Sequence, residues 1–380
     1  MRKPRILIVD DELINRKLLH GAFRNRDYQI LEATGGTEAL ELLSEDSSID
    51  LILLDIMMPE MDGFEVCARI KNQPALREIP IIIITSLTDR DSKLRGLETG
   101  AIDFLTKPLD SVEVRLRVDQ QLQLRQLYME LKQSQTRMRN EILAAKTIQM
   151  NLLPENDQNF SDSYSFKFDY YPCEELAGDF LDCIALNNQH IMFYITDVSG
   201  HGAASSLITI FVKEFIRSYA PKMEPDNPAG LIKLLNDTFL SMDFSQRFLT
   251  LLVCVLDLEN NICTWSIAGA NNPPMVLREN MSETLTEQSL PVGWFPDKKW
   301  ANHSFRMEKN DLLLLYSDAA TEVSGNSGVE LGRENFKKMV EQNQVRENCD
   351  LQHLRKLLLD YSSNRKLRDD LTLIGLKRLI

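Results

Sequence analysis

Carboxylates close two apolar runs near the start of the chain. Asp10 and Asp11 follow the apolar run 6–9, and Asp55 follows the run 51–54. Strands that are apolar at every position are buried on both faces, as in parallel α/β sheets, so their carboxyl ends gather at one edge. Clustered carboxylates need a cation, and an aspartate beside a cation can attack a phosphoryl donor as a nucleophile. The spacing therefore predicts a phosphoacceptor site at Asp55.

Two further polar side chains follow apolar runs later in the same region. Thr85 comes after the run 81–84, and Lys107 comes after the segment 102–106. A hydroxyl and an ammonium group can hold phosphate oxygens, so each residue type has a role in phosphoryl transfer. Any one of these residues alone is explained as a solvated loop residue. The complete set, one group at each strand end, favours the phosphoacceptor interpretation.

On these residues, the region from 4 to about 122 resembles the receiver domain of bacterial two-component response regulators. The resemblance implies a flavodoxin-like, doubly wound parallel sheet and a sensor histidine kinase as phosphoryl donor. It implies that Asp55 is the phosphoacceptor and that Mg²⁺ is bound by Asp10, Asp11, Asp55 and the backbone carbonyl of Met57. It implies switch residues at Thr85 and Phe104 and a phosphate-binding residue at Lys107.

The composition limits the class of protein. A chain of 380 residues is long enough for two or three domains. Its net charge of -13, from 43 basic and 56 acidic residues, argues against a nucleic-acid partner. No apolar stretch approaches the roughly 20 residues that span a bilayer, so we expect a cytoplasmic protein without a membrane partner. The six cysteines show no metal-ligand spacing and are predicted to be reduced thiols.

The segment 111–153 contains neither glycine nor proline and is rich in good helix formers, which predicts one long helix. Apolar residues recur in it every seven positions, which indicates an imperfect coiled coil. These positions are Leu124, Leu131, Met138, Ala145 and Leu152. A coiled coil would make the chain a homodimer and transmit the state of Asp55 to the second half. A single helix packed on its own domain is the alternative.

A second set of acids accompanies apolar runs in the later part of the chain. Its members are Asp179, Asp197 after the run 191–195, Asp318 after 312–316, and the pair Asp369 and Asp370 before 371–374. Any one of them alone is explained as a turn former. Hard oxygen ligands without histidine or cysteine suit Mg²⁺ or Mn²⁺. Two such ions can activate water for attack on a phosphoester, so the set predicts phosphate-ester hydrolysis without a protein nucleophile.

The sequence around these acids resembles the PPM-type, protein phosphatase 2C-like serine/threonine phosphatases, in the branch of sporulation and stress partner-switching enzymes. The similar motifs are Glu-Glu-Leu-Ala-Gly-Asp-Phe-Leu-Asp at 174–182, Asp-Val-Ser-Gly-His-Gly at 197–202, Ala-Gly-Ala-Asn-Asn-Pro-Pro at 268–274, Ser-Asp-Ala-Ala-Thr-Glu at 317–322 and Asp-Asp-Leu-Thr at 369–372. The resemblance covers about 145–380. It implies an α+β domain, a central β-sandwich flanked by helices such as 203–219 and 229–241.

The same resemblance implies two Mn²⁺ or Mg²⁺ ions in the catalytic site. Their ligands would be Asp179, Asp197, the carbonyl of Val198, Asp318 and Asp369. Asp370 is not assigned as a ligand, and His201 is given no catalytic role. Asp182 is interpreted as a solvated surface carboxylate, with a position that supports the metal ligands or belongs to a weaker metal site as the alternative.

Two residues depart from the family pattern. Ala319 replaces the glycine that usually follows the third aspartate, and Ala270 stands where histidine is common. Neither change removes a metal ligand. A glycine-to-alanine change matters where a positive φ is needed, so Ala319 raises the expectation of reduced or conditional activity.

The predicted organisation is a receiver domain at 1–122, a helical linker at 111–153 that continues the last receiver helix, and a phosphatase domain at 154–380. The predicted function is a metal-dependent phosphoserine/phosphothreonine phosphatase controlled by phosphorylation of Asp55. By resemblance, its substrate is a phosphorylated anti-sigma-factor antagonist. The alternative is a non-catalytic adaptor that binds a sigma factor or its regulator. Retention of the metal-binding acids, among them Asp179 and Asp197, favours the enzyme.

Overall fold

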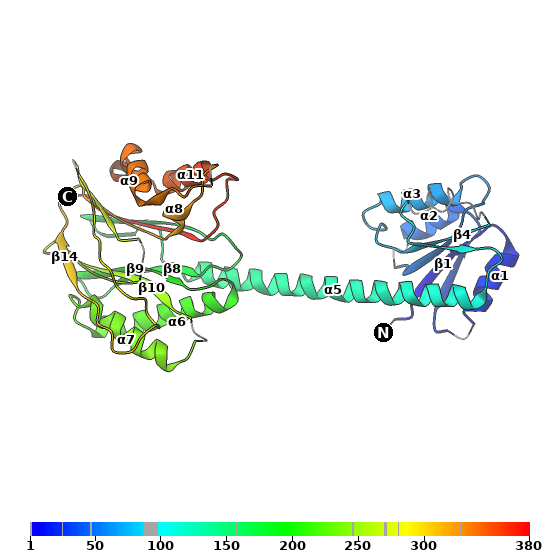
Figure 1. Ribbon diagram of the computed structural model, residues 1–380, viewed down its shortest axis with the longest axis horizontal. Coiled ribbons are helices and arrows are strands. Elements are labelled where there is room, and N and C mark those ends of the chain that lie inside the picture. Colours follow the sequence, from blue (N-terminus) through cyan, green and yellow to red (C-terminus); the bar gives the residue numbers. More distant parts are fainter. Residues whose placement is uncertain are drawn as a thin grey trace. The chain divides into compact units, whose positions relative to one another are not determined.

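The chain forms two compact units, Met1–Met138 and Arg139–Ile380. The structure is a computed structural model that describes residues 2–24, 26–45, 48–86, 98–156, 158–244, 247–269, 272–279, 281–326 and 328–380. The boundary between the units falls inside the helix α5 (Ser111–Asn151), which is drawn with the other elements in Figure 1. Within these ranges, no helix combines the length and the apolar character needed to cross a membrane.

The first unit is built on a five-stranded parallel sheet with the strand order β2-β1-β3-β4-β5. Its strands are β1 (Arg5–Val9), β2 (Gln29–Ala33), β3 (Leu51–Asp55), β4 (Ile81–Thr85) and β5 (Asp103–Thr106). Its helices are α1 (Leu13–Ala22), α2 (Gly36–Glu45), α3 (Gly63–Asn72) and the beginning of α5. This is the doubly wound order of flavodoxin-like folds, so the predicted receiver fold is confirmed.

Apolar side chains pack on both faces of this sheet. Leu7 and Leu54 belong to the cluster that packs with α2 and α3. Ile8 and Leu53 belong to the opposite cluster, which includes Val118 of α5. Neighbouring residues of a strand point to opposite faces, so a strand covered on both sides is apolar throughout. The polar residues that follow these strands are thereby left at the carboxyl edge.

The helix α5 is tied to the first unit along its early part. Arg125 donates hydrogen bonds to the carbonyl oxygens of Glu78 (2.7 Å) and Ile49 (3.2 Å). Three of the predicted heptad side chains are open to solvent, with Leu124 63%, Leu131 58% and Met138 62% exposed, whereas Ala145 and Leu152 are half-buried. The predicted long helix is confirmed by α5, while its pairing with a second copy stays a prediction.

The second unit contains two antiparallel sheets, with the orders β14-β11-β10-β9-β8 and β13-β12-β15-β16-β7-β6. The strands are β6 (Gln158–Ser161), β7 (Tyr164–Tyr171), β8 (Asp179–Ala185), β9 (His190–Val198), β10 (Leu249–Asp257), β11 (Ile262–Ala268), β12 (Met275–Leu277), β13 (Ser282–Thr284), β14 (His303–Arg306), β15 (Leu312–Tyr316) and β16 (Leu371–Arg378). The helices are α6 (Ala203–Tyr219), a 3-10 turn (Ala220–Lys222), α7 (Pro228–Ser241), α8 (Ala319–Glu322), α9 (Gly332–Gln342), α10 (Val345–Asn348) and α11 (Leu351–Tyr361).

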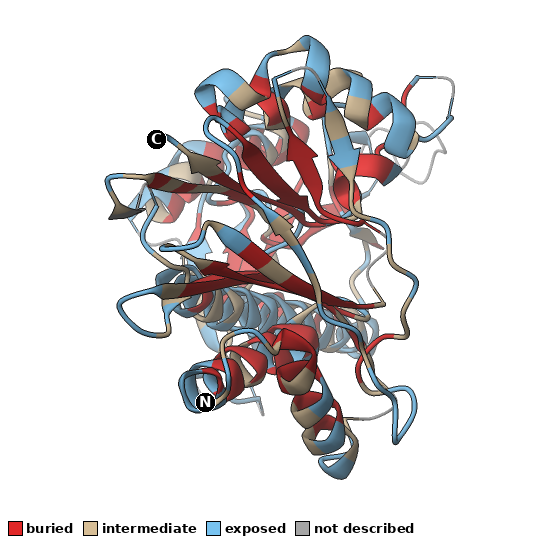
Figure 2. Cartoon of the chain, turned by 90° about the vertical axis from the view of Figure 1, so that its left-hand side faces the viewer, coloured by how far each residue is buried: buried red, intermediate tan, exposed pale blue. Residues whose placement is uncertain are grey.

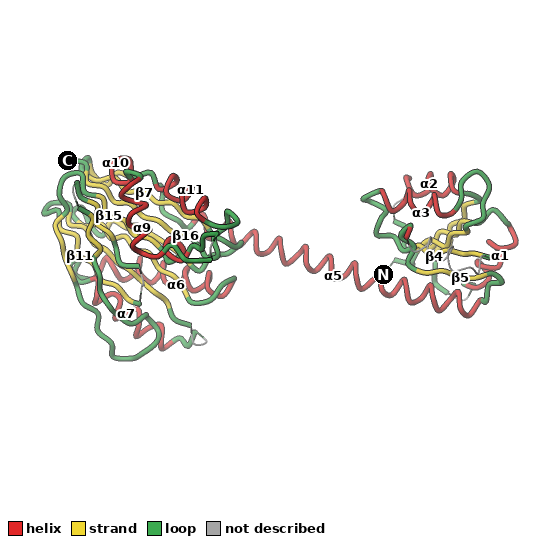
Figure 3. Tube along the Cα trace, turned by 45° about the horizontal axis from the view of Figure 1, so that its top comes forward, coloured by secondary structure: helices red, strands yellow, loops and turns green. Residues whose placement is uncertain are grey.

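The two sheets pack face to face and helices cover their outer faces. One apolar cluster, which includes Phe193 and Leu313, fills the space between the sheets. A second cluster joins α6 and α7 to β9 and β10, and a third joins α9 and α11 to β15 and β16. Figure 2 shows the strands largely buried, and Figure 3 shows the helices outside them. The predicted sandwich is confirmed, and the predicted helices 203–219 and 229–241 correspond to α6 and α7.

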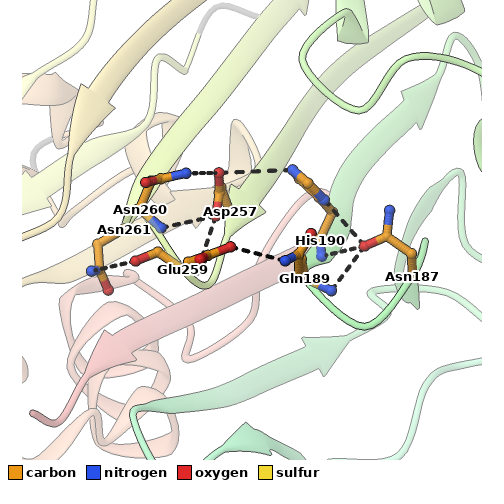
Figure 4. A network of polar contacts seen from close by, with 7 residues as sticks. All are labelled: Asn187, Gln189, His190, Asp257, Glu259, Asn260 and Asn261. Atoms are coloured by element: carbon orange, nitrogen blue, oxygen red, sulfur yellow. Dashed lines mark hydrogen bonds and ion pairs between the residues drawn. The ribbon is translucent and has the colours of Figure 1, made fainter.

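A network of polar contacts joins two turns at one end of the first of these sheets (Figure 4). Asn187 accepts hydrogen bonds from the backbone N–H of Gln189 (2.8 Å), and Gln189 donates through its side chain to Glu259 (2.8 Å). His190 lies opposite Asp257 in the pairing of β9 with β10. These turns lie at the end of β8 and β9 away from Asp179, so they stabilise the sheet without contributing to the acidic cluster described below.

Candidate functional site

Three aspartates meet at the carboxyl edge of the parallel sheet. Carboxylate oxygens of Asp10, Asp11 and Asp55 all lie within 4.8 Å of one another. Asp10 and Asp55 are buried at the ends of the paired strands β1 and β3, whereas Asp11 is exposed. The ammonium nitrogen of Lys107 lies 3.1 Å from Asp55 and 3.4 Å from Asp10. The structure therefore brings together the predicted phosphoacceptor, two acids and the predicted phosphate-binding lysine.

The electrostatics of this edge suit a bound cation. Burial raises the pKa of Asp55 to about 6, although the charge of Lys107 opposes the rise. The Oδ1 atom of Asp55 is buried and has no hydrogen-bond partner among the residues that the structure describes. An unpaired buried carboxylate oxygen is costly, and hard oxygen ligands of this kind fit Mg²⁺.

The turn after Asp55 is shaped by a close backbone approach. A Cβ atom at Gly63 would lie 2.2 Å from the carbonyl oxygen of Asp55, so only glycine fits there. Gly63 donates its N–H to the carbonyl of Ile56 (3.0 Å), and Asp62 caps α3 through the N–H of Glu65 (2.7 Å). Met57 lies inside this turn, two residues after Asp55, with which β3 ends.

The predicted switch residues lie on the two neighbouring strands. Thr85 ends β4 and is buried, opposite Thr106 of β5 in the strand register. Phe104 of β5 is half-buried and packs against the core beside α2 and α3. The peptide bond between Lys107 and Pro108 is cis. These positions agree with the predicted arrangement, while the switch roles remain to be tested.

A second acidic cluster lines a cavity of about 50 Å³ in the second unit. The cavity is lined by Asp179, Ile195, Thr196, Asp197, Thr250, Asn272, Tyr316, Ser317 and Asp318. Asp179 and Asp197 are direct partners in the antiparallel pairing of β8 with β9, and Asp318 follows β15 of the other sheet. Asp369, just before β16, is exposed and does not line the cavity, but its charge acts on Asp197 and Asp318. Both sheets therefore contribute acids to one site.

Burial and neighbouring like charges raise the pKa values of these carboxyls. Burial and the Asp197 carboxylate raise the pKa of Asp179 well above its ordinary value. Burial, together with Asp318 and Asp369, raises the pKa of Asp197 to about 7. Burial, followed by the charges of Asp369 and Glu322, raises the pKa of Asp318 to about 6. A buried set of oxygen donors that repel one another fits divalent cations such as Mg²⁺ or Mn²⁺.

Backbone and side-chain hydrogen bonds hold Asp179 in place. Thr372 of β16 donates its hydroxyl to the Oδ2 of Asp179 (2.7 Å). The carboxylate of Asp370 accepts the N–H groups of Cys173 and Gly178, each at 2.8 Å. Because both of its oxygens are used in this way, Asp370 positions the segment before Asp179. Sequence reasoning gave Thr372 no role, although it lies in the same motif.

The segment before Asp179 also contacts the end of α5. Gln149 is buried, donates to the carbonyl of Ala177 (2.9 Å) and accepts from the N–H of Ala177 (3.2 Å). A Cβ atom at Gly178 would lie 3.1 Å from the carbonyl oxygen of Val198, so β8 and β9 approach closely there. Gln149 was assigned no role from the sequence. Its position, a polar residue in the last turns of the helix before Pro154, is the feature that could have indicated one.

The prediction for Asp182 was wrong. Its side chain is fully buried rather than solvated. Arg217 donates to both of its oxygens (2.7 and 2.9 Å), and the ammonium of Lys213 lies 3.4 Å away. Both cations come from α6, which covers this sheet, and their charges compensate for the burial of the carboxylate. Lys213 also donates to the carbonyl of Leu152, just after α5.

Three other residues stand out in the predicted phosphatase motifs: His201, Ala319 and Ala270. His201 is 88% exposed, and its Nδ1 atom lies 3.8 Å from Glu174. Ala319 begins α8 and is not among the residues with positive φ, so no backbone strain follows from the replacement of glycine. Ala270 lies outside the described residues.

Comparisons with known proteins agree with both units. Residues 187–379 match the family described as Stage II sporulation protein E (SpoIIE), and residues 6–119 match the response regulator receiver domain. The SiaA-PP2C domain of Pseudomonas aeruginosa superposes with a TM-score of 0.56 at 17% identity, covering 66% of this chain and 100% of that domain. At that identity the similarity establishes the fold alone.

Curated relatives match the first unit. Response regulator PleD of Caulobacter vibrioides is 46% identical over 114 residues, which cover 30% of this chain and 25% of that protein. Two-component response regulator ORR3 of rice (Oryza sativa) is 37% identical over 112 residues, 30% of this chain and 86% of that protein. The chain thus spans about a quarter of the length of PleD.

The fold and the two acidic sites define a response regulator receiver joined to a PP2C-type β-sandwich. The chain belongs to the SpoIIE family and carries the receiver in its first unit.

Proposed function

We propose that this chain is a response regulator in which phosphorylation of Asp55 controls a metal-dependent phosphoserine/phosphothreonine phosphatase. The observation that supports the phosphatase is the cavity in which Asp179, Asp197 and Asp318 converge from both sheets. The proposed domains are a receiver at 1–122, a linker at 111–153 and a phosphatase at 154–380. The proposed substrate is a phosphorylated anti-sigma-factor antagonist.

In the proposed phosphatase site, the ligands are Asp179, Asp197, the Val198 carbonyl, Asp318 and Asp369. A pair of Mn²⁺ or Mg²⁺ ions bound there would supply an activated water and offset the charge of the phosphoryl group. Thr372 fixes the orientation of the Asp179 carboxylate, and Asp370 fixes the backbone before it. No side chain of the chain needs to act as the nucleophile.

In the proposed receiver site, the Asp55 carboxylate attacks a phosphoryl group supplied by a sensor histidine kinase. Mg²⁺ held by Asp10, Asp11, Asp55 and the Met57 carbonyl would offset the charge that develops. Lys107 then pairs with the phosphate oxygens instead of with the free Asp55 carboxylate. Thr85 and Phe104, on the neighbouring strands β4 and β5, would change position when Asp55 is phosphorylated.

The test of this function is Mn²⁺-dependent release of phosphate from a phosphoserine protein, with and without a small acyl phosphate that phosphorylates Asp55. Turnover that requires the metal and changes with the acyl phosphate is the expected result. A normal receiver reaction with no turnover in either state would favour the non-catalytic adaptor.

Gln149 supports a specific route for the control. It joins the end of α5 to Ala177, two residues before Asp179, so movement of the helix end would displace that ligand. We expect Gln149→Ala to raise the Mn²⁺ concentration for half-maximal turnover about tenfold, because losing two buried hydrogen bonds costs about 1–2 kcal/mol. A titration of turnover against Mn²⁺ measures this shift.

Gln135→Ala is the matched control, since Gln135 is an exposed glutamine of the same helix. It should leave the Mn²⁺ titration unchanged. Equal titrations for Gln149→Ala and the wild type would show that the contact with Ala177 plays no part in metal binding.

We also propose that the chain is a homodimer through the apolar stripe of α5. The exposure of Leu131 and Met138 supports this, because burying such side chains contributes about 1.5–3 kcal/mol each. The double change Leu131→Glu and Met138→Glu should halve the mass measured by sedimentation. Gln133→Glu, outside the stripe, should not. A monomeric wild type at micromolar concentration would exclude this dimer.

A further inference from the structure

Three aromatic side chains form a surface on the second unit, here named the aromatic surface: Phe248, Trp294 and Phe295. Trp294 and Phe295 are each 49% exposed. The ring of Trp294 lies 5.0 Å from that of Phe248 and 6.3 Å from that of Phe295, both in edge-to-face contact. Large apolar side chains that remain together at the surface mark binding sites more often than chance exposure does.

The backbone that presents these rings is held rigidly. Buried Asn236 of α7 accepts the N–H of Gly293 (2.9 Å) and donates to the carbonyl of Phe295 (3.1 Å). Leu249 and Val292 exchange two backbone hydrogen bonds, each of 3.0 Å. The aromatic rings are therefore exposed on a fixed turn, and a surface held ready in this way loses little entropy when it binds a partner.

Gly293 is required for this turn. Its φ is +92°, and a Cβ atom there would lie 2.7 Å from the ring of Phe239. The turn is thus packed directly on Phe239 of α7.

The aromatic surface lies beside the acidic cavity. Ser199, two residues after Asp197, donates its N–H to the carbonyl of Phe248 (2.9 Å) and accepts the N–H of Phe248 (3.0 Å). Thr250 lines the cavity and lies two residues along the chain from Phe248. At about 3.3 Å per residue, the aromatic surface begins roughly 7 Å from the cavity.

We propose that the aromatic surface docks apolar residues flanking the phosphorylated side chain of a phosphoprotein substrate. This rests on the proposed phosphatase function and adds the class of substrate sequence. Two observations favour a phosphoprotein as the partner: the aromatic surface lies next to the acidic cavity, and a lysine lies beside it. Lys298 places its ammonium 5.6 Å from the centre of the Phe295 ring, and so offers a cation to a phosphorylated partner on a chain of net charge -13.

The geometry sets the spacing of the docked residues. The ring separations place the far end of the surface at most roughly 18 Å from the cavity, and an extended peptide advances about 3.3 Å per residue. Apolar residues about two to five positions from the phosphoserine would therefore reach Phe248, Trp294 and Phe295.

The test compares two phosphoserine peptides of equal length and charge, one with leucines at these positions and one with serines. With Mn²⁺, the wild type should show a kcat/KM about tenfold higher for the leucine peptide. The double variant Trp294→Ala with Phe295→Ala should reduce this preference to about twofold or less. Hydrolysis of para-nitrophenyl phosphate, which is too small to reach the surface, should be unchanged. Ile262→Ala is the control, since Ile262 is 40% exposed at the far end of the same sheet.

Binding of the labelled peptides by fluorescence polarisation in EDTA separates docking from catalysis. A leucine preference in binding that the double variant loses supports docking even without any turnover, in which case only the proposed phosphatase fails. Turnover of para-nitrophenyl phosphate without a leucine preference overturns docking alone. A double variant that changes the mass in sedimentation while keeping the leucine preference shows a contact between copies of the chain, and also overturns it.

Discussion

Asp179→Asn should reduce Mn²⁺-dependent hydrolysis of para-nitrophenyl phosphate by about 10³-fold or more. The Asp179 carboxylate is buried opposite Asp197 and is proposed as a ligand of the metal pair. Metal ions supply several kcal/mol of charge stabilisation in the transition state, and each 1.36 kcal/mol is a factor of ten in rate. An asparagine keeps the size of the side chain, so the loss would reflect charge and not packing.

Asp257→Asn is the matched control, because Asp257 belongs to the same sheet but lies at the end away from Asp179. It should keep hydrolysis within about twofold of the wild type. Full activity in Asp179→Asn would contradict the assigned ligand, and equal loss in both variants would indicate a general effect on folding.

Asp179→Asn should increase the stability of the metal-free fold, although it is expected to reduce activity. Asp197 has a pKa of about 7 in the folded protein against an ordinary 3.8, so the folded chain binds more protons than the unfolded chain between these values. Stability of the metal-free unit therefore falls as the pH rises from about 4 to about 7. Asp179→Asn removes a carboxyl whose own pKa is raised by burial and by the Asp197 carboxylate. It should therefore raise the melting temperature at pH 8 by roughly 2–4 °C, with little change at pH 4.

Tryptophan fluorescence can follow this transition selectively. All three tryptophans, at positions 265, 294 and 300, lie in the second unit. At pH 8, saturating Mn²⁺ should give the wild type a higher melting temperature than Asp179→Asn, the reverse of the metal-free result. A melting temperature independent of pH in the metal-free wild type would contradict the proposed repulsion.

Asp55→Asn should abolish incorporation of phosphate from a small acyl phosphate and, with it, the response of the phosphatase to that donor. The asparagine amide cannot act as the carboxylate nucleophile. Basal turnover should persist, because Asp55 belongs to the first unit and the acidic cavity to the second. Incorporation is measured with radiolabelled donor, and turnover is measured in parallel.

Asp27→Asn, at an exposed aspartate of the same unit, is the control and should be phosphorylated normally. Phosphate incorporated into Asp55→Asn would place the phosphoacceptor elsewhere. Incorporation that is lost while the phosphatase still responds to the acyl phosphate would break the proposed link between the two sites.

Local patterns predicted most of the secondary structure for identifiable reasons. Leu312 and Leu314 pack toward α9 and α11, while Leu313 and Leu315 pack between the sheets, so β15 is apolar at every position. The long helix α5 followed from a segment without glycine or proline. Conformational propensity and burial determine the residue types within a short segment. Such patterns can therefore be recognised without any knowledge of distant contacts.

Contacts between distant segments could not be derived in this way. Asp182 was predicted to be exposed, because its partner Arg217 lies 35 residues later and only the packing of α6 on the sheet brings them together. The hydrogen bond from Thr372 to Asp179 joins residues 193 positions apart. The hydrogen bonds of Asn236 with Gly293 and Phe295, which hold the turn of Trp294, join two more separate segments.

The sequence by itself determined the types of the elements, the identities of the acids and the ends of the strands on which they lie. Only the tertiary structure decided which side chains support them, such as Thr372 and Gln149, and which surface lies beside the cavity. The physical reason is that a strand or helix is specified by neighbouring residues. The environment of a buried carboxylate depends instead on how separate sheets and helices pack together.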